Sequence, residues 1–367
     1  MEFRRRFHTL LIMACSTTYI CIIFLNVGGR YYSKQRQDKG EEKLSRSLEM
    51  TEKTEKFSTP VEEVAETDTQ RKRVRVWVLA GSMGRSGTSL MGELMAQEKP
   101  SIYLFEPGLF VRASTGTKVT EVQGIPFLRD MFECRFSEPF IEWLYTRSKG
   151  NVVRHPMTHR CKSARECFTV DSLSRKCLQE ELMIIKVIRY RIRWLKEMLS
   201  DENYDMKLVY MIRDPRASLR SMWAHLLKLS PMEACPLIED DLAQIQELQE
   251  KFPGRALRLE YENFCLDSGA EAKKLWRFLS DDPNANLPPL WLRFLEKHTH
   301  MKKSNKTPVF GTVRNTRQEY EAWRWEIKED LLNETEKYCS SVISKLGHRL
   351  FGSLSVARNA SLSLATG

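Results

Sequence analysis

A glycine-rich stretch at residues 81–89 has the side chains of an anion-binding loop. Glycine lets the backbone approach a ligand closely, and amides at the start of a helix can converge on a phosphate because the helix dipole favours negative charge there. The stretch also contains hydroxyl donors and one fixed positive charge, supplied by Ser86, Thr88, Ser89 and Arg85. We therefore predict a phosphate-binding loop, with an ordinary glycine-rich turn as the alternative.

This loop is not a Walker A motif, which needs four residues between its glycines and a lysine after the second. Five residues separate Gly81 from Gly87, and Thr88 stands at the position of the lysine. The spacing disfavours a P-loop nucleotide kinase or phosphotransferase, which is kept as an alternative function.

A second anion-binding candidate follows an apolar run at 207–212. Arg213 ends this run, and the Asp-Pro pair after it suits the first turn of a helix. A guanidinium fork matches the geometry of a phosphate. Ser221 lies about two helical turns along and can reach the same ligand if the helix starts beside the strand end. The alternative is a helix start with an exposed ion pair.

These candidates follow predicted strands. Four segments are expected strands: 74–80, an apolar run rich in β-branched residues, and then 182–188, 207–212 and 256–261. Helices are expected after them, at 88–97, around 194–199, from 215 to about 229, and from about 270 to 279. Strands that alternate with helices predict an α/β fold with a parallel sheet and helices on both faces. Ligands bind beyond the carboxyl ends of such strands, so the loops after these strands should surround one cleft.

The motifs resemble those of sulfotransferases that use 3′-phosphoadenylyl sulfate (PAPS). Arg85-Ser-Gly-Thr-Ser89 resembles their 5′-phosphosulfate-binding loop, and Ile212-Arg-Asp-Pro-Arg-Ala-Ser218 resembles their 3′-phosphate-binding segment. In that segment an arginine and a serine eight residues later hold the phosphate, the spacing of Arg213 and Ser221. The resemblance covers about 74–352 and implies a P-loop-like sheet of the sulfotransferase fold.

Two further segments resemble the Golgi branch that sulfates the 6-hydroxyl of galactose, N-acetylglucosamine or N-acetylgalactosamine: Gly92-Glu-Leu-Met95 and Tyr103-Leu-Phe-Glu-Pro107. The resemblance implies PAPS as co-substrate, no metal, and a glycan or proteoglycan acceptor. It implies these cofactor-binding residues: Arg85, Ser86, Gly87, Thr88, Ser89, Arg213, Ser221 and Arg314. Many members carry lysine where this chain has Arg85, and because arginine does not release its proton, its role here should be electrostatic.

Glu106 is the candidate general base, since related enzymes place a carboxylate near the acceptor in the Leu-Phe-Glu-Pro segment. Burial between Phe105 and Pro107 is expected to raise its pKa, and a structural ion pair is the alternative. Lys186 interrupts the apolar run 182–188, where an unpaired ammonium is costly, so it should serve the site or pair with a buried carboxylate. Arg189 and Arg191 could meet an acidic glycan or face solvent.

The N-terminal region carries targeting signals. Residues 7–27 are almost uncharged, follow three arginines, and are long enough to cross a bilayer as a helix. We predict a cytoplasmic tail at 1–6, a transmembrane signal-anchor at 7–27, a lumenal stem at 28–72, the sulfotransferase domain at 73–352 and a tail at 353–367. A cleaved signal peptide is the alternative to the anchor.

The cysteines agree with a lumenal location. Of 9 cysteines, seven lie in the main body, with no C-x-x-C pair and no zinc spacing. Disulfides in an oxidising lumen explain this usage better than metal binding, and the odd number leaves at least one thiol free or paired between chains. Three glycosylation sequons, at Asn305, Asn333 and Asn359, also favour a single-pass type II protein of the Golgi membrane.

Composition sets the wider limits. The 367 residues are 42% hydrophobic, which suits a globular domain, and the formal net charge of +10 favours anionic partners. No aromatic–basic module or zinc motif occurs, so nucleic acid is a poor candidate partner. A non-catalytic, membrane-anchored protein that binds anions or glycans is a further alternative. The sequence makes no prediction of the oligomeric state.

Overall fold

The computed structural model describes residues 74–146, 153–154, 168–224, 229–299, 312–313 and 315–366. All of them belong to one compact unit, Arg71–Gly367. The predicted membrane anchor, the predicted stem and Arg314 lie outside the described residues. Within the described ranges, no helix combines the length and apolarity needed to cross a membrane.

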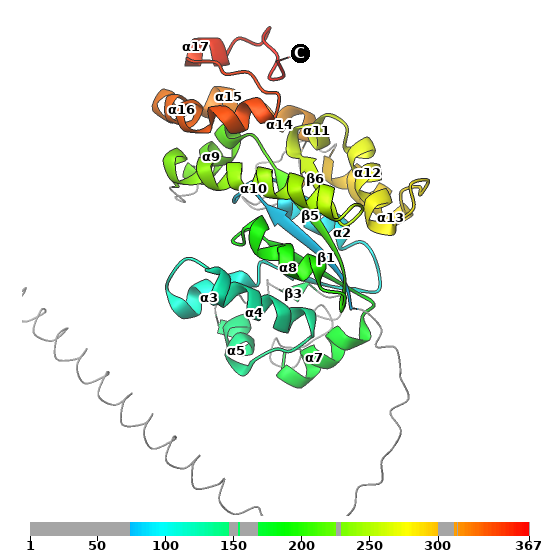
Figure 1. Cartoon of the computed structure of the whole chain (residues 1–367). Helices are drawn as coiled ribbons and strands as arrows, with labels where there is room; N and C mark the ends of the chain where they lie inside the picture. The colour runs from blue at the N-terminus through cyan, green and yellow to red at the C-terminus, as the bar shows by residue number, and fades with distance from the viewer. Residues whose placement is uncertain are drawn as a thin grey trace, which may run out of the picture. The chain divides into compact units, whose positions relative to one another are not determined.

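Among the described residues, a six-stranded sheet has the strand order β3-β2-β4-β1-β5-β6. Figure 1 labels β1, β5 and β6, which are neighbours in this sheet. All neighbouring strands pair in parallel except β3, which runs antiparallel to β2 at one edge. The strands are β1 (Val74–Gly81), β2 (Ser101–Phe105), β3 (Val153–Arg154), β4 (Leu182–Val187), β5 (Tyr204–Ile212) and β6 (Ala256–Glu260). The predicted α/β fold with a parallel sheet is therefore confirmed.

The strand boundaries show what the apolar pattern captures. The predicted and observed ends of β1, β4 and β6 agree to within one residue. β5 begins earlier than predicted, at Tyr204, because Tyr204 and Met206 are buried and pair with β1 although the exposed Asp205 interrupts the apolar run. β2 was not predicted as a strand, since five residues are too few to show a clear period.

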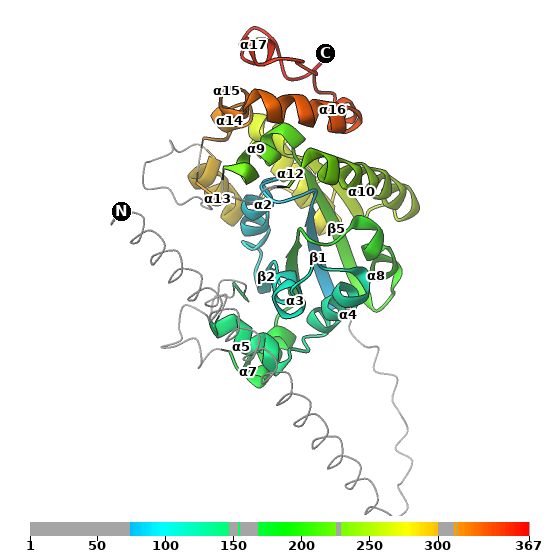
Figure 2. The ribbon, with the colours of Figure 1, turned by 90° about the vertical axis from the view of Figure 1, so that its left-hand side faces the viewer.

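Helices cover both faces of the sheet (Figure 2). On β1, Trp77 and Leu79 join a core with α2 (Thr88–Met95), α12 (Ser268–Ser280) and α13 (Pro289–Thr299). The alternate residues Val76 and Val78 join the opposite core, with the other large helices. Because both faces are buried, the strands read as nearly continuous apolar runs.

The second core is formed by helices from several parts of the chain. They include α3 (Gly108–Thr115), α4 (Glu121–Phe132), α5 (Glu138–Thr146), α7 (Val170–Gln179), η2 (Ile192–Leu195), α8 (Lys196–Ser200), α9 (Pro215–Trp223), α10 (Pro231–Lys251) and α16 (Glu329–Lys345). The shorter helices α11 (Tyr261–Leu266), α14 (Thr316–Glu319), α15 (Trp323–Glu326) and α17 (Leu354–Ala357) complete the described elements. α9 ends before the predicted position near 229, where Ser230 already caps α10 by accepting from the Glu233 amide.

Within the described ranges, two disulfides tie distant segments of the chain together, as predicted for an oxidising compartment. Cys235 of α10 bonds to Cys339 of α16, and Cys134, just after α4, bonds to Cys177 of α7. Cys265 is buried. Cys161 and Cys167 lie outside the described residues.

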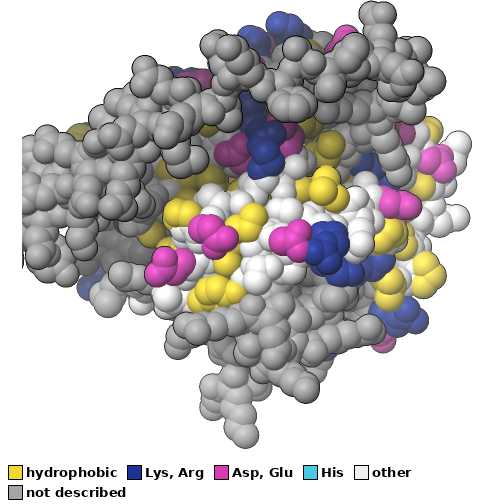
Figure 3. All heavy atoms as spheres, turned by 90° about the horizontal axis from the view of Figure 1, so that it is seen from below, with side chains coloured by type: hydrophobic (Ala, Val, Ile, Leu, Met, Phe, Trp, Pro, Cys, Tyr) yellow, Lys and Arg dark blue, Asp and Glu magenta, His cyan; other side chains and the backbone are white. Residues whose placement is uncertain are grey.

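Charge is mixed on the face shown in Figure 3. Wherever the residues of this face are described, acidic, basic and hydrophobic side chains alternate over it. The net positive charge of the chain is therefore not gathered into one basic patch on the described part of this face.

Candidate active site

The candidate site lies at the carboxyl ends of four neighbouring parallel strands. Glu106 follows β2, the loop 82–87 follows β1, Arg189 follows β4 and Arg213 follows β5. Since β2, β4, β1 and β5 are adjacent and parallel, these positions lie together at the carboxyl ends of the strands. Parallel α/β sheets bind their ligands at this end of the strands.

The loop after β1 needs glycine at its last position. Gly87, the N-cap of α2, has a φ of 90°, a left-handed conformation that side chains rarely adopt. A Cβ there would lie 2.3 Å from the Tyr261 Cδ2 atom, so the space is closed as well. Among the described residues, no side chain caps α2, so the first amides of this helix are available to a ligand.

Buried polar atoms in this region fit an anionic ligand. The Ser86 side chain is fully buried, and its Oγ has no hydrogen-bond partner among the described residues. The Nε atom of Arg213 is also buried and likewise has no hydrogen-bond partner among these residues. Because an unsatisfied buried donor costs about 1–3 kcal/mol, such donors are usually satisfied by a ligand or by water. A phosphate group supplies the acceptors that both atoms lack.

The structure brings the two predicted phosphate-binding segments together. The Arg213 Nη1 donates to the carbonyl oxygen of Arg85 at 3.1 Å. The Arg85 Nε in turn donates to Ser221 Oγ at 3.0 Å. The Arg213 guanidinium also stacks on the Tyr261 ring, 4.3 Å from its centroid. Arg85, Arg213 and Ser221 therefore line one site.

A buried ion-pair cluster adjoins the loop. Lys186 Nζ donates to Glu106 Oε1 at 2.6 Å and to Ser89 Oγ at 3.1 Å. It also lies over the Phe105 ring, 3.9 Å from the centroid. Arg189 Nη1 pairs with the second carboxylate oxygen of Glu106. Lys186, which is 2% exposed, thus connects the start of α2 to the candidate base.

The expected rise in the Glu106 pKa is wrong. Burial alone would raise this pKa, but the charges and hydrogen bonds of Lys186 and Arg189 outweigh burial and lower it below 4.5. Glu106 is therefore held as a carboxylate between two cations. Its backbone also has an uncommon positive φ of 53°.

Arg191 is not an open contact for a ligand. Its Nη1 lies 2.9 Å from Asp241 Oδ2, and its side chain is 12% exposed. The same carboxylate accepts from the Ile192 amide at 3.0 Å. The pair fixes the chain just after Arg189 against α10. Arg191 is thus structural, contrary to both expectations for it.

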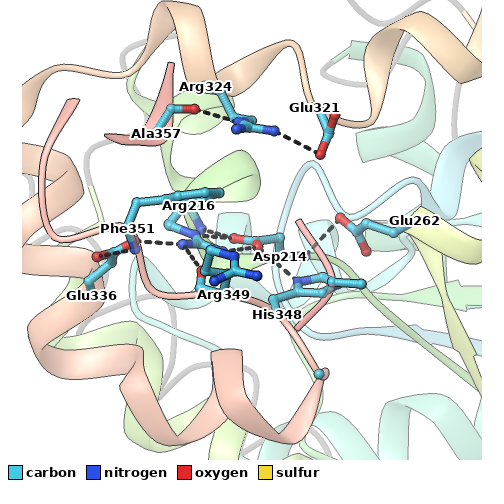
Figure 4. A network of polar contacts seen from close by, with 12 residues as sticks. Asp214, Arg216, Glu262, Glu321, Arg324, Glu336, His348, Arg349, Phe351 and Ala357 are labelled. Atoms are coloured by element: carbon cyan, nitrogen blue, oxygen red, sulfur yellow. Dashed lines mark hydrogen bonds and ion pairs between the residues drawn. The ribbon is translucent and has the colours of Figure 1, made fainter. Parts of the chain in front are cut away.

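The sequence did not predict a polar network that includes Asp214, the residue after Arg213 (Figure 4). Asp214 accepts from Arg216 Nη2 at 2.7 Å and lies 2.9 Å from His348 Nδ1. Arg216 also donates to Glu336 Oε1 at 2.6 Å, and Glu336 accepts the backbone amide of Phe351 at 2.9 Å. The network ties the start of α9 to the segment after α16. The Asp-Pro pair marks the helix start in the sequence, but nothing local indicates partners more than 100 residues away.

The fold and these contacts define a polar site with unsatisfied buried donors at the carboxyl ends of parallel strands, where α/β sheets bind ligands. No protein-family profile matches the chain. It is nevertheless similar to mouse carbohydrate sulfotransferase 4, with 24% identity over 350 residues that cover 82% of this chain and 88% of that protein. Human carbohydrate sulfotransferase 5 is 26% identical over 345 residues, covering 79% of this chain and 82% of that protein.

Among solved structures, the chain is similar to the sulfotransferase domain of the Synechococcus PCC 7002 olefin synthase. The TM-score is 0.42 and the identity 15%, over 78% of this chain and 98% of that domain. The sequence similarities confirm the predicted resemblance to carbohydrate sulfotransferases over about four fifths of the chain.

Proposed function

We propose that this chain is a carbohydrate sulfotransferase that moves a sulfuryl group from PAPS to a sugar hydroxyl. The contact between the Arg85 loop and the Arg213 strand end carries the proposal, because it makes one site from the two segments that a doubly phosphorylated nucleotide needs. The similarity to carbohydrate sulfotransferases supports the same activity.

The proposed cofactor site has two ends. Arg85, Ser86, Gly87, Thr88 and Ser89 would hold the 5′-phosphosulfate with backbone amides, hydroxyls and one guanidinium. Arg213 and Ser221 would hold the 3′-phosphate. Arg314 stays in the proposed set by resemblance, although it lies outside the described residues. When bound, PAPS supplies a sulfuryl group on a phosphate leaving group.

The chain's own cations would stabilise the charge that develops in transfer. Arg85 acts electrostatically, because its guanidinium keeps its proton. Lys186 Nζ already contacts both Ser89 and Glu106, so its positive charge reaches the phosphate end and the acceptor end of the site. We therefore assign Lys186 to charge stabilisation and to holding Glu106 in place.

Glu106 is the proposed base for the acceptor hydroxyl. It is ionised, as a base must be, but its lowered pKa makes it a weak one while both cations contact it. An acceptor hydroxyl that displaced Arg189, the more exposed of the two cations, would strengthen the base at the moment of use. The 6-hydroxyl of galactose, N-acetylglucosamine or N-acetylgalactosamine is the proposed acceptor position.

We also propose the Golgi lumen as the compartment, with residues 7–27 as a type II membrane anchor. The two disulfides favour an oxidising compartment. The anchor is an expectation from the sequence, since 7–27 lie outside the described residues.

A transfer assay tests the function. The full-length protein is incubated with sulfur-labelled PAPS, a metal chelator and a panel of glycans: desulfated chondroitin, desulfated keratan and glycans with terminal N-acetylglucosamine. Label on a glycan is expected. In a parallel incubation with labelled ATP and Mg²⁺ and without the chelator, transfer of label would indicate a kinase. Nucleotide or glycan binding without transfer in either incubation would indicate a non-catalytic receptor.

A further inference from the structure

The buried carboxyl group of Glu262 contacts the backbone of the turn that follows Arg213. Glu262 of α11 is 3% exposed, and its Oε1 accepts from the backbone N–H of Asp214 at 3.1 Å (Figure 4). Its Oε2 is buried and has no hydrogen-bond partner in the described part of the chain. The preceding residue, Tyr261, provides the ring on which Arg213 stacks. Glu262 therefore fixes the turn that presents Arg213 to the site.

Charges from two sides face Glu262. Arg213 and Asp214 belong to the turn between β5 and α9, and His348 belongs to the segment after α16. Asp214 is itself fully buried and paired with Arg216. Arg216 also forms an ion pair with Glu336.

The surroundings of Glu262 bring the pKa of its carboxyl group close to neutral pH. Burial and the Asp214 carboxylate raise its pKa to about 7, although Arg213 and His348 act in the opposite direction. A phosphate at Arg213 would add negative charge nearby and would neutralise part of the positive charge that stabilises the Glu262 carboxylate. Both effects favour the protonated carboxyl, and they are strong where water is excluded.

We propose that Glu262 is a positioning residue of the cofactor site and takes up a proton when a phosphate binds at Arg213. The inference rests on the proposed function, because it requires Arg213 to be the phosphate ligand. The proton comes from solvent and forms an O–H bond at Oε2, and no other covalent bond changes. Oε1 still accepts from the Asp214 amide, so the turn stays in place while its charge changes.

Calorimetry measures this proton directly. Adenosine 3′,5′-bisphosphate (PAP) is titrated into the full-length protein at pH 7.5 in two buffers that differ in ionisation enthalpy. The wild-type protein should take up more protons per PAP than Glu262→Gln, whose amide still accepts from Asp214 but does not titrate. Wild-type affinity for PAP should fall by about tenfold between pH 6.5 and 8.5, and the variant should change less.

5′-AMP is the matched ligand, since it lacks the 3′-phosphate, and it should give the same proton count with both proteins. His348→Gln is the matched control variant, because His348 contacts the side chain of Asp214, the residue whose backbone amide Glu262 accepts. This substitution should not abolish the proton uptake. Uptake that is lost in His348→Gln and kept in Glu262→Gln assigns the proton to His348 and overturns the inference.

The outcomes separate this inference from the proposed function. Equal proton counts for the wild type and Glu262→Gln, with PAP bound by both, overturn the inference alone. Failure of the wild type to bind PAP overturns both. If Glu262→Gln does not fold, the wild type decides: equal uptake with PAP and 5′-AMP refutes the role of the 3′-phosphate, and greater uptake with PAP supports it.

Discussion

The Arg213 guanidinium donates to the carbonyl oxygen of Arg85 at 3.1 Å, although 128 positions separate the two residues in the chain. Arg85 in turn donates to Ser221 of α9 at 3.0 Å. The loop after β1 and the exit of β5 are therefore parts of one polar cluster. A substitution in either segment should therefore change the affinity for the same ligand, so variants of both segments test the site.

Removing the strand-end ligands should weaken nucleotide binding and leave the fold intact. Hydrogen bonds to charged groups contribute about 1.5–3 kcal/mol, so Arg213→Ala should weaken PAP binding by roughly 10- to 150-fold and Ser221→Ala by about tenfold. Calorimetry measures the affinity, and circular dichroism checks the fold. Arg220→Ala is the control, since this arginine of the same helix pairs with Glu326 at 2.7 Å. Unchanged PAP affinity in both site variants would refute the assignment.

Glu106→Gln should separate chemistry from binding. Loss of a general base lowers turnover by about 10²- to 10⁴-fold, whereas PAP affinity should change little. Sulfate-transfer rates and PAP titrations on the same preparation measure the two effects. Glu138→Gln, an exposed carboxylate in the first turn of α5, is the control. Turnover near the wild-type value would leave Glu106 with only its structural ion pairs.

The sequence predicted the elements that have local signals. β1, its glycine loop and α2 together span the 22 residues from Val74 to Met95, and each has its own pattern: an apolar run, glycines and a helical period. The Asp-Pro pair likewise marks the start of α9. These features depend on neighbours in the chain, so composition and spacing reveal them.

The electrostatics of the site were not predictable in this way. The segment around Glu106 shows Phe105 and Pro107, which suggest burial and a raised pKa. The groups that reverse this, Lys186 on β4 and Arg189 just after it, lie about 80 positions later in the chain. Arg191 is misjudged for the same reason, because its partner Asp241 lies on α10. The sign of a pKa shift depends on tertiary neighbours, and only the packed sheet shows them.

Gly87→Ala should damage the site more than a comparable glycine change elsewhere. The substitution combines a φ of 90° with a Cβ that would lie 2.3 Å from the Tyr261 ring. We expect a loss of about 1–3 kcal/mol in unfolding free energy and loss of PAP binding. Gly116→Ala is the control, because its φ of 70° is similar but nothing lies within 4 Å. Equal losses in the two variants would show that backbone strain alone, without the Tyr261 contact, explains the effect.

The disulfides should stabilise the domain by closing long loops. Cys235–Cys339 spans 104 positions and Cys134–Cys177 spans 43. Chain-entropy arguments and measured cases give a loss of about 2–5 kcal/mol for each bond, with the longer loop expected to lose more. Urea unfolding of Cys339→Ser and Cys177→Ser, with and without reductant, measures this. Reductant should destabilise the wild type, and a wild type insensitive to complete reduction would contradict the expectation.

Stability should fall as pH rises from about 4.5 to 7, in part because of Glu262. Its pKa is raised from 4.5 to about 7, so the folded state holds a proton that the unfolded chain has already released in this window. The state that binds more protons is favoured at low pH, so the contribution of Glu262 to the unfolding free energy decreases with rising pH and levels off above about 7. His348, whose pKa is raised above 6.5, acts in the same direction at higher pH, and Asp241, with a pKa of about 6, acts at lower pH.

Glu262→Gln removes only the contribution of Glu262 to this pH dependence, so urea titrations between pH 4.5 and 8 should give a flatter profile for the variant. Parallel profiles for the two proteins would show that Glu262 titrates alike in the folded and unfolded chains.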